Sequence, residues 1–241
     1  IEATPALLND QRRRFVSSPD IVLQPNSIES VQKIMRFCFE NRIHVTPQGG
    51  NTGLCGATVT TEGVLLNLSK LNRIRDINLA DNSMTVEAGV ILQNAQKAAT
   101  EAGRLFPLSL ASEGSCQIGG NIACNAGGLN VLRYGSMRDL VLGLEVVLPN
   151  GELVSHLQPL HKNTTGYDLR HLFIGSEGTL GIITAATLKL FAQPKTKATA
   201  WVGLDDIESA VSLLTAVQGY FAERLTSFEL ISHFALDLSS E

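Results

Sequence analysis

Four glycine-rich segments constrain the fold of this 241-residue chain more than any other feature of its sequence. They occupy residues 47–56, 112–121, 125–136 and 175–184, within a chain that otherwise has ordinary helix-like and strand-like apolar patterns. Glycine permits positive φ angles and lets the backbone approach a ligand closely. One short glycine pattern often arises by chance, but four in one chain predict loops that converge on a bound molecule.

The first segment, Pro47-Gln48-Gly49-Gly50-Asn51-Thr52-Gly53-Leu54, is typical of a phosphate-binding turn. Successive free N–H groups in such a turn form a concave nest that accepts phosphate oxygens. The segment is not a P-loop, because no Lys-Ser or Lys-Thr follows its glycines, and Asn51 breaks the GxGxxG pattern. Taken alone, it is equally compatible with an ordinary glycine-rich turn.

Two of the other three segments lie in a long region without strong periodicity. Residues 106–135 form a predicted loop of about thirty residues, which is unusual in a compact domain unless the loop is functional. Its small residues and amides favour contact between the backbone and a flat, polar ring system. The segment at 175–184 leads into a predicted strand. A purely structural interpretation of it, without ligand binding, is a bulge at the start of that strand.

Apolar spacing predicts a strand–helix–strand unit near the start of the chain. It consists of a strand at residues 21–24, a helix capped by Ser27 and a strand at 43–46, the size of a parallel crossover. Asn150-Gly151 predicts a hairpin turn. Further strands are predicted at residues 64–68, 73–78, 84–87, 142–148, 152–157 and 182–190, and a helix at 91–102.

A boundary is predicted at residues 194–197. Beyond it, we predict a strand at 198–204, a helix capped by Asp205 and a strand at 225–230. A lone strand–helix–strand unit leaves a sheet edge and one sheet face uncovered. The predicted organisation is therefore an N-terminal segment (1–19), a large domain (20–195) and the start of a truncated C-terminal domain (196–241).

Composition excludes several functional classes. The formal charge of −4 gives no basic surface to attract nucleic acid or an anionic membrane. No apolar run is long enough to approach a membrane span. The four cysteines form neither a CxxC pair nor a disulfide framework, and zinc-ligand spacing is absent. No intact signal peptide is visible, so we expect a cytoplasmic protein, or a mitochondrial-matrix protein if the source is eukaryotic.

The combined motifs resemble the FAD-binding domain of the vanillyl-alcohol oxidase and p-cresol methylhydroxylase (PCMH) family. The resemblance rests on residues 114–121, 125–128, 132–135 and 162–169, and it covers residues 20–195. Within the family, the chain is most similar to the D-2-hydroxyglutarate and D-lactate dehydrogenase branch. The resemblance implies an α+β fold: a two-subdomain, PCMH-type FAD-binding domain, followed by the start of an α/β, ferredoxin-like substrate domain.

The resemblance also implies which residues bind FAD. Those of the first loop would wrap the diphosphate, and those of the later segments would lie near the ribityl chain, the isoalloxazine ring and the adenine. The implied set is Pro47, Gly49, Gly50, Asn51, Thr52, Gly53, Leu54, Pro107, Ser112, Gly114, Ser115, Ile118, Gly119, Gly120, Asn121, Asn125, Gly127, Tyr134, Gly135, Glu177, Gly178, Gly181 and Ile182. Covalent relatives carry a flavin-linked His in the first loop; this loop has none, so non-covalent FAD is expected.

The implied activity is oxidation of a small 2-hydroxy acid to a 2-oxo acid, with hydride transfer to flavin N5. Electrons would then pass to an acceptor such as an electron-transfer flavoprotein or a quinone. The catalytic residues, and a divalent metal where present, are expected in the C-terminal domain outside this segment, and a homodimer is an open alternative. Two rival functions stay open: a transferase similar to ether-lipid synthases, and a non-catalytic FAD-binding subunit.

Overall fold

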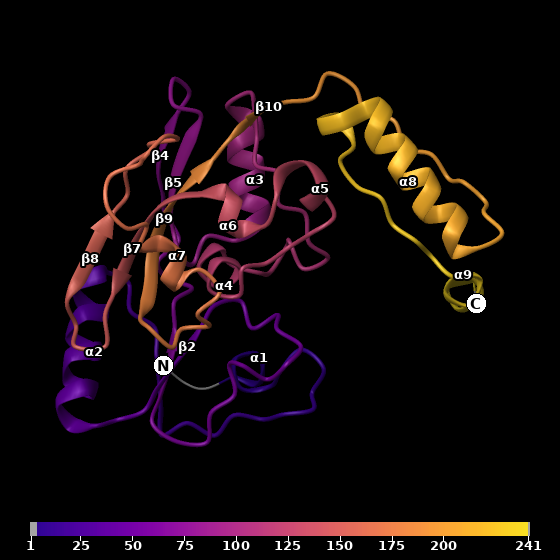
Figure 1. Ribbon diagram of the computed structural model, residues 1–241. Coiled ribbons are helices and arrows are strands. Elements are labelled where there is room, and N and C mark those ends of the chain that lie inside the picture. The colour runs from indigo at the N-terminus through magenta and orange to yellow at the C-terminus, as the bar shows by residue number, and fades with distance from the viewer. Residues whose placement is uncertain (1–3, 241) are drawn as a thin grey trace.

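A computed structural model describes residues 4–240, which contain two main sheets (Figure 1). The first sheet is parallel, with strand order β1-β3-β2, and consists of β1 (Ile21–Leu23), β2 (Val45–Gln48) and β3 (Val64–Asn67). Helix α2 (Ile28–Asn41) connects β1 to β2. It begins after Ser27, whose hydroxyl accepts a hydrogen bond from the N–H of Ser30 at 3.2 Å.

The second sheet is antiparallel, with strand order β4-β5-β9-β7-β8. Its strands are β4 (Ile74–Asn78), β5 (Ser83–Glu87), β7 (Val141–Val147), β8 (Leu153–His156) and β9 (Ile182–Lys189). Three helices bury apolar side chains against this sheet in the larger core: α3 (Leu92–Glu101), α4 (Ile118–Ala123) and α6 (Met137–Leu140). Two one-turn helices, α5 (Val131–Tyr134) and α7 (Arg170–Phe173), lie in the connections.

Helix α2 joins the two sheets through a smaller core. Its buried Val31 and Met35 pack in one cluster with Leu66 of β3 and with Val147 and Ile182, which lie at the ends of β7 and β9. Gly151, at φ 82°, lies directly against α2, because a Cβ there would contact the Gln32 carbonyl oxygen at 2.7 Å. The contact fixes the ends of β7 and β9 beside the first sheet.

The C-terminal part differs from the prediction. After β10 (Phe191–Ala192), which pairs with β6 (Arg104–Leu105), the chain runs without a strand to α8 (Ile207–Phe221), η1 (Ala222–Arg224) and α9 (His233–Ser240). The strands predicted at 198–204 and 225–230 are wrong, because these apolar runs have no neighbouring strand among residues 4–240 to pair with. The cap of α8 is Asp206 and not Asp205, since Asp206 accepts the Ser209 N–H at 2.7 Å.

The predicted α+β class is confirmed, and most predicted strands and helices form within two residues of their expected bounds. The predicted loop at 106–135 contains the short helices α4 and α5, which the glycine-rich composition concealed. The ferredoxin-like character of the last segment and the domain limits at residues 20 and 195 stay predictions. No helix within residues 4–240 is long and apolar enough to cross a bilayer.

Candidate functional site

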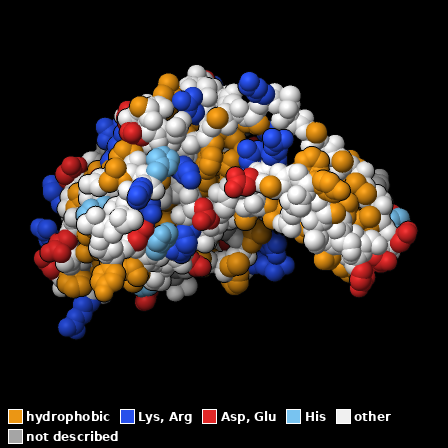
Figure 2. Space-filling view, turned by 45° about the horizontal axis from the view of Figure 1, so that its top comes forward, with side chains coloured by type: hydrophobic (Ala, Val, Ile, Leu, Met, Phe, Trp, Pro, Cys, Tyr) orange, Lys and Arg blue, Asp and Glu red, His pale blue; other side chains and the backbone are white. Residues whose placement is uncertain are grey.

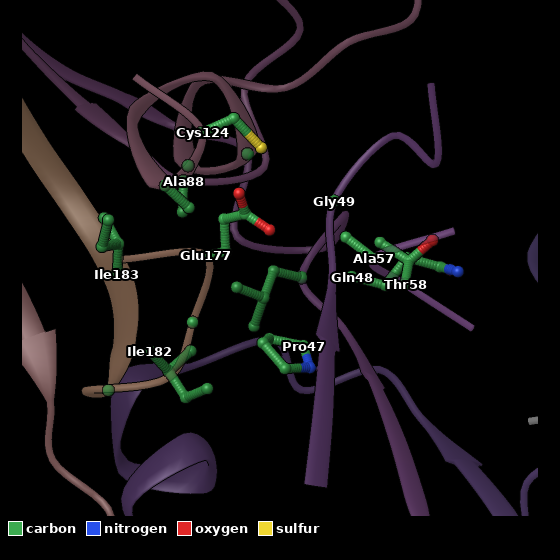
Figure 3. Close-up of a pocket in the computed structure, with 16 residues that line it drawn as sticks. Pro47, Gln48, Gly49, Ala57, Thr58, Ala88, Cys124, Glu177, Ile182 and Ile183 are labelled. Atoms are coloured by element: carbon green, nitrogen blue, oxygen red, sulfur yellow. The ribbon is translucent and has the colours of Figure 1, made fainter. Parts of the chain in front are cut away.

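The first and last glycine-rich segments meet α4 in an open cleft (Figure 3). The cleft lies at the carboxyl ends of β2, β3 and β5, opposite α4 and the start of β9. Its lining residues are Pro47, Gln48, Gly49, Ala57, Thr58, Leu68, Ala88, Gly119, Gly120, Ala123, Cys124, Glu177, Gly178, Gly181, Ile182 and Ile183.

Backbone hydrogen bonds hold the last glycine segment against α4. The N–H of Gly175 donates to the Ile122 carbonyl at 3.1 Å, and the N–H of Glu177 donates to the Ala123 carbonyl at 2.9 Å. Gly178, at φ 80°, lies so close to Pro47 that a Cβ would overlap the proline ring. These contacts bring segments that are about 130 residues apart in sequence to one wall of the cleft.

The first glycine segment presents unpaired backbone donors. The N–H groups of residues 49–53 donate no hydrogen bond to another described residue. Asn67 holds the start of this loop: its Nδ2 donates to the Gly49 carbonyl and to Gln48 Oε1, each at 3.1 Å. Because backbone donors seldom stay unpaired in folded proteins, a run of them on a fixed loop is suited to an anion such as a phosphate.

The glycines of the site fall into two groups. Gly50 and Gly119 are required by packing, since a Cβ would overlap the Ser115 carbonyl oxygen in the first case and lie 2.6 Å from Ala88 Cβ in the second. Gly53 and Gly120 have no protein atom within 4 Å of the position that a Cβ would take. Gly120 lines the cleft, so the space above it is a cradle that a side chain would fill and that a flat ligand can use.

Two titratable side chains reach the cleft wall, Glu177 and Cys124 (Figure 3). Desolvation, and then the negative charge of Glu177, raise the pKa of the Cys124 thiol, so this side chain is a neutral thiol at pH 7. Glu177 has an uncommon positive φ of 52°. Its carboxylate can only accept hydrogen bonds, which suits the hydroxyl or amino donors of a ligand and repels phosphate.

Comparisons with known proteins place this geometry in a family. The family described as an FAD binding domain matches residues 19–156. The chain belongs to the FAD binding domain family. Its unpaired loop amides and the open cradle at Gly120 fit a ligand with both a diphosphate and a flat ring.

Curated relatives extend the similarity over nearly the whole chain. The chain is 38% identical to the D-2-hydroxyglutarate–pyruvate transhydrogenase of Saccharomyces cerevisiae, over 96% of this chain and 47% of that protein. It is 41% identical to the mitochondrial D-2-hydroxyglutarate dehydrogenase of Danio rerio (95% and 43% of the two chains). It is 42% identical to the D-2-hydroxyglutarate dehydrogenase of Xanthomonas citri (95% and 48%). The chain therefore spans less than half the length of these relatives.

A solved structure shows the same fold. An alkyldihydroxyacetonephosphate synthase superimposes on 76% of this chain and 32% of its own, with a TM-score of 0.67 and 23% identity. At this identity the likeness concerns the FAD-binding fold alone.

The structure places twelve of the predicted FAD-binding residues in two hollows. The cleft contains eight of them: Pro47, Gly49, Gly119, Gly120, Glu177, Gly178, Gly181 and Ile182. Four more, Gly50, Asn51, Thr52 and Ser115, line a neighbouring recess. Residues of the N-terminal segment line the same recess. The remaining eleven line neither hollow: Gly53, Leu54, Pro107, Ser112, Gly114, Ile118, Asn121, Asn125, Gly127, Tyr134 and Gly135.

Several residues of this third group have visible structural contacts. Tyr134 is buried, with its ring edge-on to Phe191 at 4.8 Å between ring centroids. Asn125 accepts the Arg138 N–H at 2.9 Å. Gly135, at φ 77°, leaves room for the carboxylate of Asp139 that caps α6. Their assignment to FAD binding stays a prediction.

Sequence patterns gave no sign of several lining residues. Ala57, Thr58, Leu68 and Ala88 lie just outside glycine segments or at strand ends, and only the fold brings them to the cleft. Gln117 was also missed: its Oε1 is buried without a hydrogen-bond partner among residues 4–240 and lies 3.5 Å from the position of a Cβ on Gly49. Gln117 directly precedes α4, so its position beside the first loop depends on tertiary packing.

Proposed function

We propose that the protein is an FAD-dependent dehydrogenase that oxidises a D-2-hydroxy acid, of the D-2-hydroxyglutarate or D-lactate type, to the 2-oxo acid. The observation that carries this proposal is the similarity, at 38–42% identity over nearly the whole chain, to relatives named for D-2-hydroxyglutarate chemistry. A further relative, from Schizosaccharomyces pombe, is named as a putative D-lactate dehydrogenase. Because the chain spans less than half of these proteins, the complete reaction is inferred.

The described residues would hold and orient FAD. The unpaired amides of residues 49–53 would bind the diphosphate, and the cradle at Gly120 would accept part of the flat ring system. Glu177 would accept hydrogen bonds from hydroxyl or amino groups of the cofactor. Bound FAD would supply the redox chemistry, by accepting the C2 hydrogen of the substrate as hydride at N5.

The substrate carboxylate and hydroxyl need groups that this cleft does not offer. A carboxylate is best bound by Arg or Lys, and the hydroxyl proton requires a base such as His. Among the described residues that line the cleft, Glu177 is the one charged side chain, and His, Lys and Arg are missing. We therefore place the carboxylate clamp, the base and any divalent metal outside residues 4–240, and propose that these residues serve the cofactor.

Anaerobic reduction tests the proposed reaction. Full-length, FAD-loaded protein is mixed without oxygen with D-2-hydroxyglutarate, D-lactate and their L enantiomers, and flavin absorbance is followed. Bleaching with a D enantiomer but not with its L counterpart is expected. If the flavin stays oxidised with every 2-hydroxy acid, the protein is not a dehydrogenase of this class.

The same assay separates the rival functions. A transferase similar to the alkyldihydroxyacetonephosphate synthase would turn over without net reduction of the flavin, and its 23% identity supports only the fold. A non-catalytic FAD-binding subunit would bind FAD but remain oxidised with all substrates. Stereospecific bleaching excludes both.

The finer properties are part of the proposal. We propose that FAD is non-covalent, that an electron-transfer flavoprotein or quinone reoxidises it, and that the protein works as a homodimer in the cytoplasm or mitochondrial matrix. Several relatives are named mitochondrial, and the yeast relative's name adds pyruvate as an acceptor to test. Acid precipitation should release all flavin into the supernatant, and reoxidation rates with each acceptor would rank them.

A further inference from the structure

The N-terminal segment forms a basic turn beside the unpaired amides of the first glycine loop. We propose that this turn, residues 9–16, closes over the diphosphate of FAD and that Arg13 is a direct ligand of its phosphate oxygens. The proposal rests on FAD binding as proposed above, and it adds a cation to a diphosphate site whose predicted ligands all lie in the first glycine loop. No residue before Pro47 was predicted to contact the cofactor.

Hydrogen bonds from the glycine loop hold the N-terminal segment in place. Gln48 Nε2 donates to the Leu7 carbonyl at 2.9 Å, next to the end of helix α1 (Pro5–Leu8). Asn51 Nδ2 donates to the carbonyls of Asn9 at 2.6 Å and Ala6 at 3.1 Å, while its Oδ1 accepts the Thr58 hydroxyl. The loop that would bind phosphate therefore also positions the turn.

A buried carboxylate shapes the turn. Asp10 is only 4% exposed, and its two oxygens accept the N–H groups of Phe15 at 2.8 Å and Arg12 at 3.2 Å. These backbone hydrogen bonds, that of Phe15 first, lower the pKa of Asp10 and keep it ionised. The Phe15 ring packs on Gly56, 3.1 Å from the position of a Cβ there, so the turn is fixed at both ends of the first glycine segment.

Arg13 lies within this turn with φ 54°, a left-handed conformation that non-glycine residues seldom adopt. Arg13 lines the recess together with Gly50, Asn51 and Thr52, whose N–H groups donate no hydrogen bond to another residue of the described range 4–240. Within residues 4–240, the Arg13 guanidinium makes neither an ion pair nor a hydrogen bond. A cationic residue without a described partner thus borders the same recess as the loop residues whose amides have none.

Charge decides where a diphosphate would lie. The cleft contributes one charged side chain, the acidic Glu177, whereas the recess contributes Arg13 and Asp10. Asp10 opposes an anion, but both its oxygens already accept hydrogen bonds, and the three arginines 12–14 leave the turn with a net charge of about +2. The diphosphate is therefore favoured at the recess end, and the ring system in the cleft.

Ligand affinity tests the role of Arg13. Purified full-length apoprotein is titrated with FAD and, separately, with ADP, which carries the diphosphate but no flavin ring. Arg13→Gln should lower the affinities for FAD and for ADP by the same factor, about tenfold, because one charge-assisted contact to phosphate is lost from both ligands. Arg13→Lys should recover part of the loss, and affinity should depend less on salt in Arg13→Gln than in the original protein.

Arg12→Gln is the matched control. It removes the same charge from the same turn, but Arg12 does not line the recess, so both affinities should change by less than about twofold. Arg13→Gly guards against misfolding, because glycine suits the positive φ of this position. It should keep or raise the thermal unfolding temperature of the apoprotein and still weaken both ligands.

The outcomes are separable. If Arg13→Gln and Arg13→Gly bind FAD and ADP as the original protein does, Arg13 is not a phosphate ligand. If the affinity for FAD falls while that for ADP does not, the turn acts on another part of the cofactor and the proposal also fails. If the original protein binds no FAD at all, the failure is that of the proposed function.

Discussion

Two adjacent glycines of α4 have different physical reasons for lacking a side chain. Gly119 lies against Ala88, while Gly120 faces open space in the cleft. We predict that Gly120→Ala stabilises the apoprotein by about 0.5–1 kcal/mol, because alanine favours a helix over glycine. The same methyl group should weaken FAD binding by about tenfold or more, since it occupies space that we assign to the cofactor.

Gly119→Ala provides the comparison. Its Cβ would lie 2.6 Å from Ala88 Cβ, so the apoprotein should lose about 1–3 kcal/mol of unfolding free energy. Urea unfolding of both apoproteins and fluorescence titration with FAD measure the two effects. A Gly120→Ala protein with unchanged FAD affinity would remove this part of α4 from the binding site.

At the scale of elements, a charged network ties strands β4, β5 and β7 together. Glu87 is 1% exposed and accepts hydrogen bonds from Arg73 and Arg75, and Arg75 also binds Glu145 at 3.0 Å. Burial opposes ionisation of Glu87, but the hydrogen bonds and charge of Arg73, followed by Arg75, outweigh it and lower its pKa. We predict that Glu87→Gln destabilises the protein by about 2–3 kcal/mol at pH 7, less than for a fully buried pair because Arg73 is exposed.

The pH dependence follows from the sign of this shift. A carboxyl group with a lowered pKa in the folded state contributes stability above its unfolded pKa of about 4.3, and that stability is lost as the pH falls through the folded value. Between pH 7 and pH 3, the free energy of unfolding measured with urea should therefore fall less steeply for Glu87→Gln than for the original protein. Glu101→Gln, at an exposed pair with Lys97, should change stability by less than about 0.5 kcal/mol. Equal effects of the two substitutions would contradict the role of the network.

The same scale shows what the sequence could predict. The helix after Ser27 and the β7–β8 hairpin follow from local signals, a cap and an Asn-Gly turn. Helix α4 could not be predicted, because its glycines disfavour helix and its position depends on close packing against Ala88. The glycine segments predicted the first loop and the last, but Leu68 and Ala88 of the cleft and Arg13 of the recess lie outside all four segments.

For the whole molecule, the cores and the candidate site lie before residue 195. Both apolar clusters and both hollows consist of residues up to Phe191, whereas Ala210 is the one buried residue described in α8. Figure 1 shows α8 and α9 apart from the sheets, and Figure 2 shows apolar side chains on that arm. Its exposed residues include Trp201 at 79% and Phe234 at 73%.

This distribution predicts that a chain ending at Lys195 folds and keeps the candidate site. Compared with the 241-residue chain, its urea midpoint should be unchanged and its FAD dissociation constant should stay within about twofold, because few contacts between α8–α9 and the cores are lost. Binding of an apolar dye should fall, since the exposed apolar patch is removed. A second truncation, before β9, is the control and should abolish folding, because β9 pairs with both β5 and β7 at the centre of the sheet. Loss of FAD binding on removal of residues 196–241 alone would show that the arm is part of the cofactor site.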